Sequence, residues 1–238
     1  MIVGKDLRVN VLGEPLFEKV DLVIRSNEHV ALVGSQEGDV SLLLRVLARE
    51  EETDRGSVAS EGERVAYVSP EVFLGGSMAL GKLHQARPTF VLFDATAPAS
   101  KSVIEDAQRF IESFKGGILI ASSEESLITS AKTTRVLEMH ASTKSVTSYT
   151  GSYAEFLTER EKNRLRTVEA YEKQQREKRR LEEWLEIKRE EASRDKKAPE
   201  KGAVIRAKVK YLKREILDKE IPKPSYLEEL PETENGHS

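Results

Sequence analysis

The segment Val30–Leu42 (VALVGSQEGDVSL) decides the class of fold. It begins as a short apolar run that ends at Gly34, which is typical of a strand buried on both faces. The apolar residues of positions 40–47 (VSLLLRVL) then recur at helical spacing. A strand, a glycine-containing turn and a helix in this order indicate an α/β fold, layered around a largely parallel sheet.

The same alternation continues through the first 150 residues. Short apolar runs that predict buried strands are separated by loops and by stretches of helical period. The predicted strands cover residues 16–24, 29–33, 65–68, 90–93, 117–121, 135–139 and 145–149, and the predicted helices cover residues 40–47, 78–85 and 103–114. This order predicts one layered α/β domain over residues 1–150.

The turn after Val33 lies where a phosphate-binding loop would. Such a loop has the pattern G-x-x-x-x-G-K-[ST], in which backbone N–H groups surround the phosphates and the lysine neutralises their charge. Here Gly34 and Ser41 occupy the first and last positions, whereas Asp39 replaces the second glycine and Val40 replaces the lysine. Both replacements act against phosphate binding, so an ordinary strand–turn–helix is the alternative interpretation.

Residues 151–238 have a different composition. They carry 42 charged side chains in 88 positions, against 37 in the first 150, which places a domain boundary near residue 150. Residues 152–197 contain no proline or glycine and predict one long helix, and residues 198–202 (APEKG) predict a turn. A second helix has apolar residues at 205, 209, 212 and 216 and ends before Pro222. We therefore predict an antiparallel helical hairpin over residues 151–220 and an acidic, disordered tail over residues 221–238.

Composition and patterning exclude several classes of protein. The chain has no cysteine, which excludes a disulfide framework, a thiolate zinc site and a cysteine nucleophile, and which fits a reducing cytosol. No apolar run approaches the ~20 residues that span a bilayer, and the N-terminus lacks a signal-peptide core. The four histidines are scattered without metal-ligand spacing. We expect a cytoplasmic chain with no membrane partner and no metal site.

Further stretches carry a resemblance that covers roughly residues 9–220. They are LFEKVDLVIRSNEHVALVGS (16–35), RVAYVSPE (64–71), RPTFVLFDATAP (87–98), GGILIASSEES (116–126), RVLEM (135–139) and TGSYAEFLTEREKNRLRTVEAYEKQQREKRRLEEWLE (150–186), with KGAVIRAKVKYLKRE (201–215) after the turn. Together they resemble the first nucleotide-binding domain and the interdomain linker of the ABC-F family, which are ATP-binding-cassette proteins without membrane domains. The resemblance implies a P-loop NTPase-like cassette followed by a helical arm.

Most positions that would act on ATP in that family differ here. The loop lysine falls at Val40, the catalytic glutamate at Ala95 and the switch histidine at Ser123. The adenine-stacking aromatic falls at about Val11 and the γ-phosphate-sensing glutamine near Pro70. Leu74-Gly75-Gly76 is similar to the family's signature motif, and almost nothing separates it from Pro70, so the helical subdomain is expected to be missing.

Hydrolysis requires charge stabilisation and a positioned water molecule. We therefore predict no catalytic residue. We also expect no cofactor, and any binding of Mg²⁺ and ATP is expected to be weak. The Mg²⁺-holding aspartate of the family corresponds to Asp94, for which an ordinary strand-end aspartate capping a turn is the alternative. The positions that would contribute to weak nucleotide binding are Gly34, Ser35, Gly38, Ser41 and Asp94.

Residues 160–220, which we call the arm, are basic. They contain 21 Lys and Arg against 14 Asp and Glu, so the arm is +7 while the rest of the chain is −10. Basic helices suit a polyanion, although mixed charges are also normal on a solvated coiled coil. Trp184 and Tyr171 would either stack on bases or pack the hairpin seam. The candidate nucleic-acid contacts are Arg176, Lys178, Arg179, Arg180, Arg194, Lys196, Lys197 and Lys201.

Three functions follow as expectations. The ABC-F linker enters the ribosome beside the peptidyl-tRNA, so the resemblance favours a degenerate ABC-F protein that binds the ribosome, through rRNA or tRNA, without hydrolysing ATP. The second is an ATP-binding subunit completed by a second ABC cassette. The third is a coiled-coil protein-interaction module that pairs through the stripe of residues 205–216.

Overall fold

The computed structural model describes residues 1–34, 37–141, 143–194, 199–217, 219 and 221. The described residues form two compact units, Met1–Thr158 and Glu159–Ser238, which are treated separately below. The boundary between the two units follows Thr158, a little after the change in charge density near residue 150. It lies there because the start of the long helix packs within the first unit. The predicted tail over 221–238 lies almost entirely outside the described residues.

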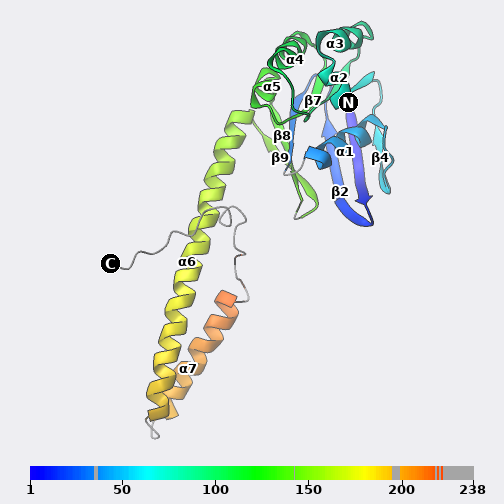
Figure 1. Ribbon diagram of the computed structural model, residues 1–238. Coiled ribbons are helices and arrows are strands. Elements are labelled where there is room, and N and C mark those ends of the chain that lie inside the picture. Colours follow the sequence, from blue (N-terminus) through cyan, green and yellow to red (C-terminus); the bar gives the residue numbers. More distant parts are fainter. Residues whose placement is uncertain (35–36, 142, 195–198, 218, 220, 222–238) are drawn as a thin grey trace. The chain divides into compact units, whose positions relative to one another are not determined.

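The first unit contains a six-stranded and a three-stranded sheet (Figure 1). The strand order of the larger sheet is β5 (Val65–Val68), β6 (Phe90–Ala95), β7 (Gly117–Ser122), β3 (His29–Gly34), β8 (Arg135–His140) and β9 (Ser145–Thr150). All neighbouring pairs are parallel except β8 and β9, which close the sheet as an antiparallel pair. The smaller, antiparallel sheet has the order β2 (Glu14–Ile24), β1 (Ile2–Val11) and β4 (Arg55–Ala59). The layered, largely parallel α/β fold is therefore confirmed.

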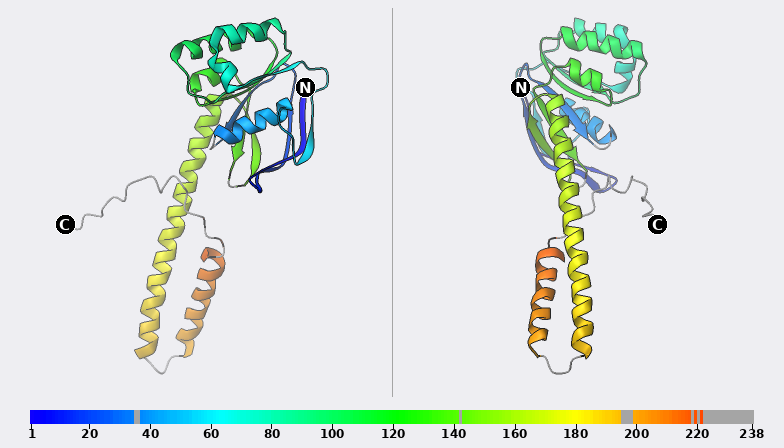
Figure 2. Two further views of the ribbon diagram at one scale, coloured as in Figure 1. Left: turned by 45° about the vertical axis from the view of Figure 1, so that its right-hand side comes forward. Right: turned by 90° about the vertical axis from the view of Figure 1, so that its left-hand side faces the viewer.

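Successive side chains of the large sheet point to opposite faces and pack into two separate cores. Phe90 and Leu92 of β6 face a core shared with helix α1 (Glu37–Ala48) and the small sheet. Val91 and Phe93 face a second core with the helices α2 (Pro70–Leu74), α3 (Gly76–Gln85), α4 (Lys101–Ser113) and α5 (Glu125–Ser130). Figure 2 shows α2–α5 gathered together and apart from α1. Because successive strand residues point to opposite faces, this layering decides which side chains can reach α1.

The segment between β5 and β6 contains α2 and α3 and no larger helical insertion. Ser69 caps α2 by accepting a hydrogen bond from the Val72 amide at 3.4 Å, and Pro70 occupies its first turn. Leu74, Gly75 and Gly76 form the junction of the two helices, and Gly76 has a φ of +56°.

Helix α6 (Tyr153–Arg194) begins at a capping box. The Ser152 amide donates to a carboxylate oxygen of Glu155 at 2.8 Å, and the Ser152 hydroxyl accepts from the Glu155 amide at 3.3 Å. The Ser152 amide, together with the Ser152 hydroxyl that also donates to the Glu155 carboxylate at 2.8 Å, favours the charged form and lowers the pKa of Glu155. In the first unit, Phe156 is buried with Ala31, Ile128 and Val136.

The second unit is a helical hairpin, with α6 antiparallel to α7 (Pro199–Tyr211) and the short π-helix η1 (Leu212–Leu217) (Figure 2). Leu185, Leu212 and Ile216 form its buried seam, flanked by partly buried Leu181, Trp184, Ile205 and Val209. The Gln174 side chain donates to the Lys219 carbonyl at 2.8 Å and accepts from the Ile221 amide at 2.7 Å, which fastens the end of the hairpin.

The predicted turn over residues 198–202 is wrong from Pro199 onward. Helix α7 begins at Pro199 and runs through Gly202. Proline is tolerated in a first turn because the first amides of a helix have no intrahelical acceptor, and one internal glycine costs only ~1 kcal/mol.

Candidate nucleotide site and basic arm

Asp94 lies at the carboxyl end of β6 and is completely buried. One of its carboxylate oxygens accepts the Thr96 hydroxyl at 2.7 Å and the Thr96 amide at 3.3 Å. The other oxygen accepts the Tyr67 hydroxyl at 3.1 Å. The Thr96 hydroxyl also lies 3.1 Å from that of Ser41, on α1. The structure therefore joins Ser41 and Asp94, both predicted from sequence, through Thr96.

Strand alternation and register bring these groups together. Asp94 follows Phe90 and Leu92 on the β6 face that looks toward α1, and Tyr67 pairs with Leu92 from the neighbouring strand β5. Burial and the adjacent Asp94 charge raise the pKa of Tyr67, so its hydroxyl keeps its proton and acts as a donor. Tyr67 and Thr96 were both missed by the sequence analysis. The proximity of Thr96 to Asp94 could have suggested a hydrogen bond, but nothing local to Tyr67 could.

The loop before α1 does not have the composition of a phosphate cradle. Gly34 ends β3, and Gly38 and Ser41 lie in the first two turns of α1, whereas Ser35 lies outside the described residues. Val40, in the position of the lysine, is buried in the core beside α1. Asp39 extends from the same turn, and partial burial raises the pKa of its carboxyl group. A carboxylate thus stands near the place where the pattern requires glycine and a cation.

The side chains present do not fit Mg²⁺ and ATP. Magnesium in nucleotide sites is bound by one or two carboxylates together with phosphates and water. A carboxylate offers about four lone-pair positions, and three of those on Asp94 already accept hydrogen bonds from Tyr67 and Thr96. The Ser41 hydroxyl is likewise engaged with Thr96. This cluster is a self-satisfied hydrogen-bond network.

The other positions that would act on ATP also lack the groups that hydrolysis requires. Ala95 is buried and has no group that could activate water. The Ser123 hydroxyl donates a long 3.5 Å bond to the Thr96 carbonyl, and Pro70 begins α2. Among the residues that the structure describes, no cluster of three or more His, Asp or Glu could hold a metal ion.

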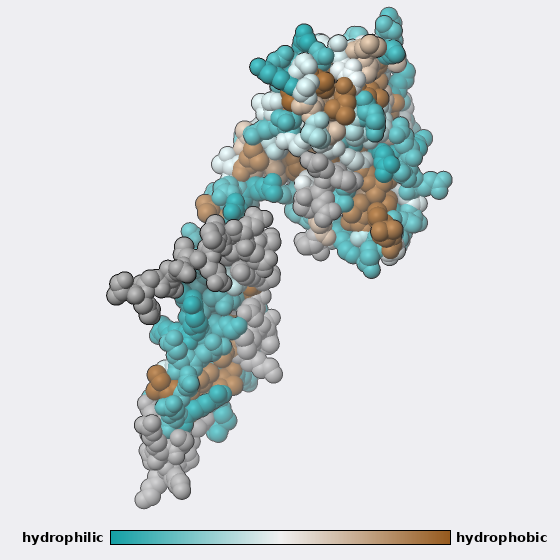
Figure 3. All heavy atoms as spheres, in the orientation of Figure 1, coloured by the Kyte–Doolittle hydropathy of each residue, from teal (hydrophilic) through white to brown (hydrophobic). Residues whose placement is uncertain are grey.

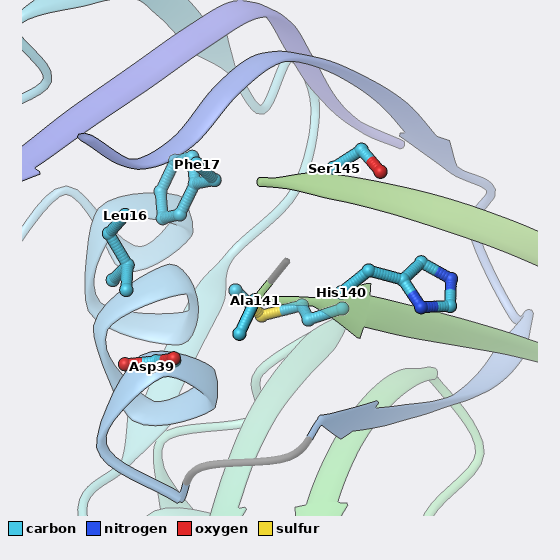
Figure 4. A pocket seen from close by; sticks show the side chains of 7 residues that line it. Leu16, Phe17, Asp39, His140, Ala141 and Ser145 are labelled. Atoms are coloured by element: carbon cyan, nitrogen blue, oxygen red, sulfur yellow. The ribbon is translucent and has the colours of Figure 1, made fainter. Parts of the chain in front are cut away.

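A pocket lies between Asp39 and the β8–β9 edge (Figure 4). It is lined by Leu16, Phe17, Asp39, Met139, His140, Ala141 and Ser145. Asp39 enters from α1, whereas the ring of His140 points away from it and lies 2.8 Å from the Thr147 hydroxyl. The pocket is too narrow to admit a water molecule, so it cannot accept a nucleotide phosphate.

A larger groove, with a volume of about 630 Å³, lies beside the tip of the β1–β2 hairpin. Val11, the position that would stack on adenine, lines it and offers no aromatic ring. Its one cation, Arg45, is paired with Glu51 at 2.9 Å. The other charged residues that line it are Asp39, Glu52 and Asp54. An anionic nucleotide would meet an excess of carboxylates there.

The predicted nucleic-acid residues fall into two groups. Arg176, Arg179 and Arg180 are exposed on adjacent turns of α6, at the i, i+3 and i+4 spacing that places them on one face. Arg176 forms an exposed ion pair with Glu172 at 3.6 Å, and Lys178 is half-buried. The backbones of Arg194 and Lys201 lie in α6 and α7, but their side chains, together with Lys196 and Lys197, lie outside the described residues.

Figure 3 shows a mostly hydrophilic face on α6, as expected for a helix with a narrow apolar seam. Trp184 belongs to that seam, as the packing alternative predicted, and Tyr171 is half-buried outside it.

No described helix combines the length and apolarity needed to cross a membrane.

Comparison with known proteins supports the fold and part of the resemblance. A family model described as "ABC transporter" matches residues 139–214, a third of the chain. A solved nucleotide-free ATP-binding cassette from an ABC transporter is similar, with a TM-score of 0.52 and 10% identity over 64% of this chain and 92% of that one. An ATP-binding subunit of an ABC transporter is also similar, with 14% identity over 63% of this chain and 90% of that one, at a TM-score of 0.45. No curated protein matches the chain. The chain thus contains the fold of an ATP-binding cassette, and the end of the first unit together with most of the arm matches the ABC transporter model.

Proposed function

We propose that this chain is an ABC-F-type protein that does not hydrolyse ATP and binds ribosomal RNA or tRNA in the cytoplasm through its arm. The observation that carries the proposal is the cluster of Arg176, Arg179 and Arg180, exposed on one face of α6. The arm as a whole has an excess of seven positive charges. Phosphate contacts supply most of the affinity of such surfaces.

The proposed absence of hydrolysis rests on the first unit. Val40, Ala95 and Ser123 supply neither the cation nor the general base nor the histidine that phosphoryl transfer would use. The carboxylate of Asp94 is engaged by Tyr67 and Thr96. The cassette would therefore serve as a scaffold that carries the arm.

Co-sedimentation with ribosomes tests the proposal. We expect the full chain to pellet with ribosomes at low salt and to dissociate progressively as salt rises. Charge reversal of Arg176, Arg179 and Arg180 to Glu should abolish pelleting, because it replaces three phosphate-binding groups with repulsive ones. A control that reverses Lys162, Arg164 and Arg166 makes the same charge change elsewhere on α6 and should weaken binding less. Failure of the unmodified chain to associate at low salt would refute ribosome binding.

A second candidate is an ATP-binding subunit completed by a partner cassette, which the cassette fold and the presence of Gly34, Ser41 and Asp94 at motif positions favour. The two candidates differ in their response to nucleotide. A ligand at a hundred times its Kd stabilises a fold by ~2.7 kcal/mol. We expect millimolar MgATP to leave the melting temperature within error of that with MgCl₂ alone, both in the parent chain and in Asp94→Asn. A rise of several degrees in the parent that Asp94→Asn removes would favour the ATP-binding subunit instead.

A further inference from the structure

The hairpin of the second unit contains a small pocket of about 290 Å³, near the lower end of the range for ligand sites. Its walls come from α6 and α7 and combine two aromatic rings, two cations, one leucine and one carboxylate. The lining residues are Glu177, Arg180, Leu181, Trp184, Lys208 and Tyr211.

The aromatic walls have definite positions. Trp184 is partly buried because one side of it packs on the seam of Leu185, Leu212 and Ile216, while another part lines the pocket. Tyr211 ends α7 and is 42% exposed. Its hydroxyl donates to Glu177 at 3.1 Å, which joins the two helices at the pocket wall. Two rings fixed in this way offer a preformed surface for stacking.

The cations flank the rings. Lys208 is exposed, and its ammonium lies 6.0 Å from the centre of the Tyr211 ring. Arg180 is exposed on α6 and belongs to the arginine cluster described above. Aromatic side chains that stack on bases, set beside Lys and Arg that follow the backbone, are the means by which proteins bind single-stranded nucleic acid.

We infer that this pocket receives one unstacked nucleobase of a single-stranded RNA segment, whose flanking phosphates contact Arg180 and Lys208. The inference rests on the proposed RNA-binding function and specifies the site at which it acts. The Glu177 carboxylate accepts the Tyr211 hydroxyl at the pocket wall, so the phosphates are placed beside Arg180 and Lys208 rather than beside Glu177.

The chain contains one tryptophan, so its emission reports directly on the pocket. Titration of the full chain with a ten-residue oligoadenylate should quench Trp184 fluorescence in parallel with binding measured by filter retention. Tyr211→Ala should weaken affinity by about 5- to 150-fold, the range that corresponds to the loss of one stacked base. Lys208→Ala removes one phosphate contact, so it should make the negative slope of log affinity against log salt less steep by ~0.7.

Four controls make the test specific. Tyr211→Phe keeps the ring but loses the hydroxyl bond to Glu177, so it should retain more affinity than Tyr211→Ala. Leu165→Ala removes an exposed side chain of α6 outside this pocket and should change affinity little. An abasic oligomer of the same length should bind more weakly without quenching, and AMP should bind at least tenfold more weakly than the oligomer.

The outcomes distinguish a failure of the pocket assignment from a failure of the proposed RNA binding. Each of three results would overturn the pocket assignment but leave RNA binding by the arm intact. They are retention of the oligoadenylate without quenching, equal binding of the abasic oligomer, and equal binding of AMP. Absence of any retention at low salt would overturn both.

Discussion

Replacing Phe93 with alanine is expected to destabilise the first unit by about 3–5 kcal/mol. Phe93 is completely buried in the core between the large sheet and helices α2–α5. Its ring meets that of Phe73 edge-on at 6.1 Å and lies 6.0 Å from that of Phe110. The substitution removes both ring contacts and leaves a cavity that surrounding elements can fill only partly.

The effect of Phe93→Ala is best measured by urea denaturation combined with hydrogen exchange of the β6 and β7 amides, which isolates the first unit from the hairpin. Met78→Ala is a suitable control, because Met78 is 74% exposed on α3 and its loss should change stability by no more than ~0.5 kcal/mol. Similar protection of β6 in the two variants would contradict the packing described here.

Thr96→Val is expected to cost about 2–3 kcal/mol, since hydrogen bonds to charged groups contribute ~1.5–3 kcal/mol. Valine preserves the shape of Thr96 but removes the hydroxyl that donates to Asp94 at 2.7 Å and meets Ser41. Asp94 is then a buried carboxylate with fewer donors. Tyr67→Phe should cost less, because the Tyr67 bond is longer, at 3.1 Å.

The same denaturation and exchange measurements apply to Thr96→Val. Ser123→Ala is the matched control, because its hydroxyl makes only a 3.5 Å bond to the Thr96 carbonyl and its loss should be nearly neutral. If Thr96→Val were no more destabilising than Ser123→Ala, the cluster around Asp94 would not be a stabilising network.

Strands with an uninterrupted pattern could be predicted from the sequence. The apolar runs at 65–68 and 90–93 fall within β5 and β6. Every residue of β6 is buried, and a strand covered on both faces requires apolar residues at successive positions. Strand β1 was missed because register shifts against its neighbours interrupt its alternation, and Asp6 has a φ of +50°. Strand β4 was missed because it is short and contains Gly56, at a φ of +92°, where a Cβ would overlap the backbone of β1.

Helices α2 and α5 were also missed. They contain five and six residues, too few for a helical period to stand out. The long helix α6 was predictable, because its interior lacks proline and glycine and Ser152 and Glu155 mark its start.

The sequence by itself determined which chemical groups the first unit lacks, because an absent lysine or glutamate at a motif position is a matter of residue identity. It also placed Ser41 and Asp94 among five candidate nucleotide-binding positions. Only the tertiary structure decided what that pair does. The donor from Tyr67 reaches Asp94 across 27 positions of the chain, through the pairing of β5 with β6. Such a contact depends on strand register and on the layer that covers the sheet, which local pattern does not specify.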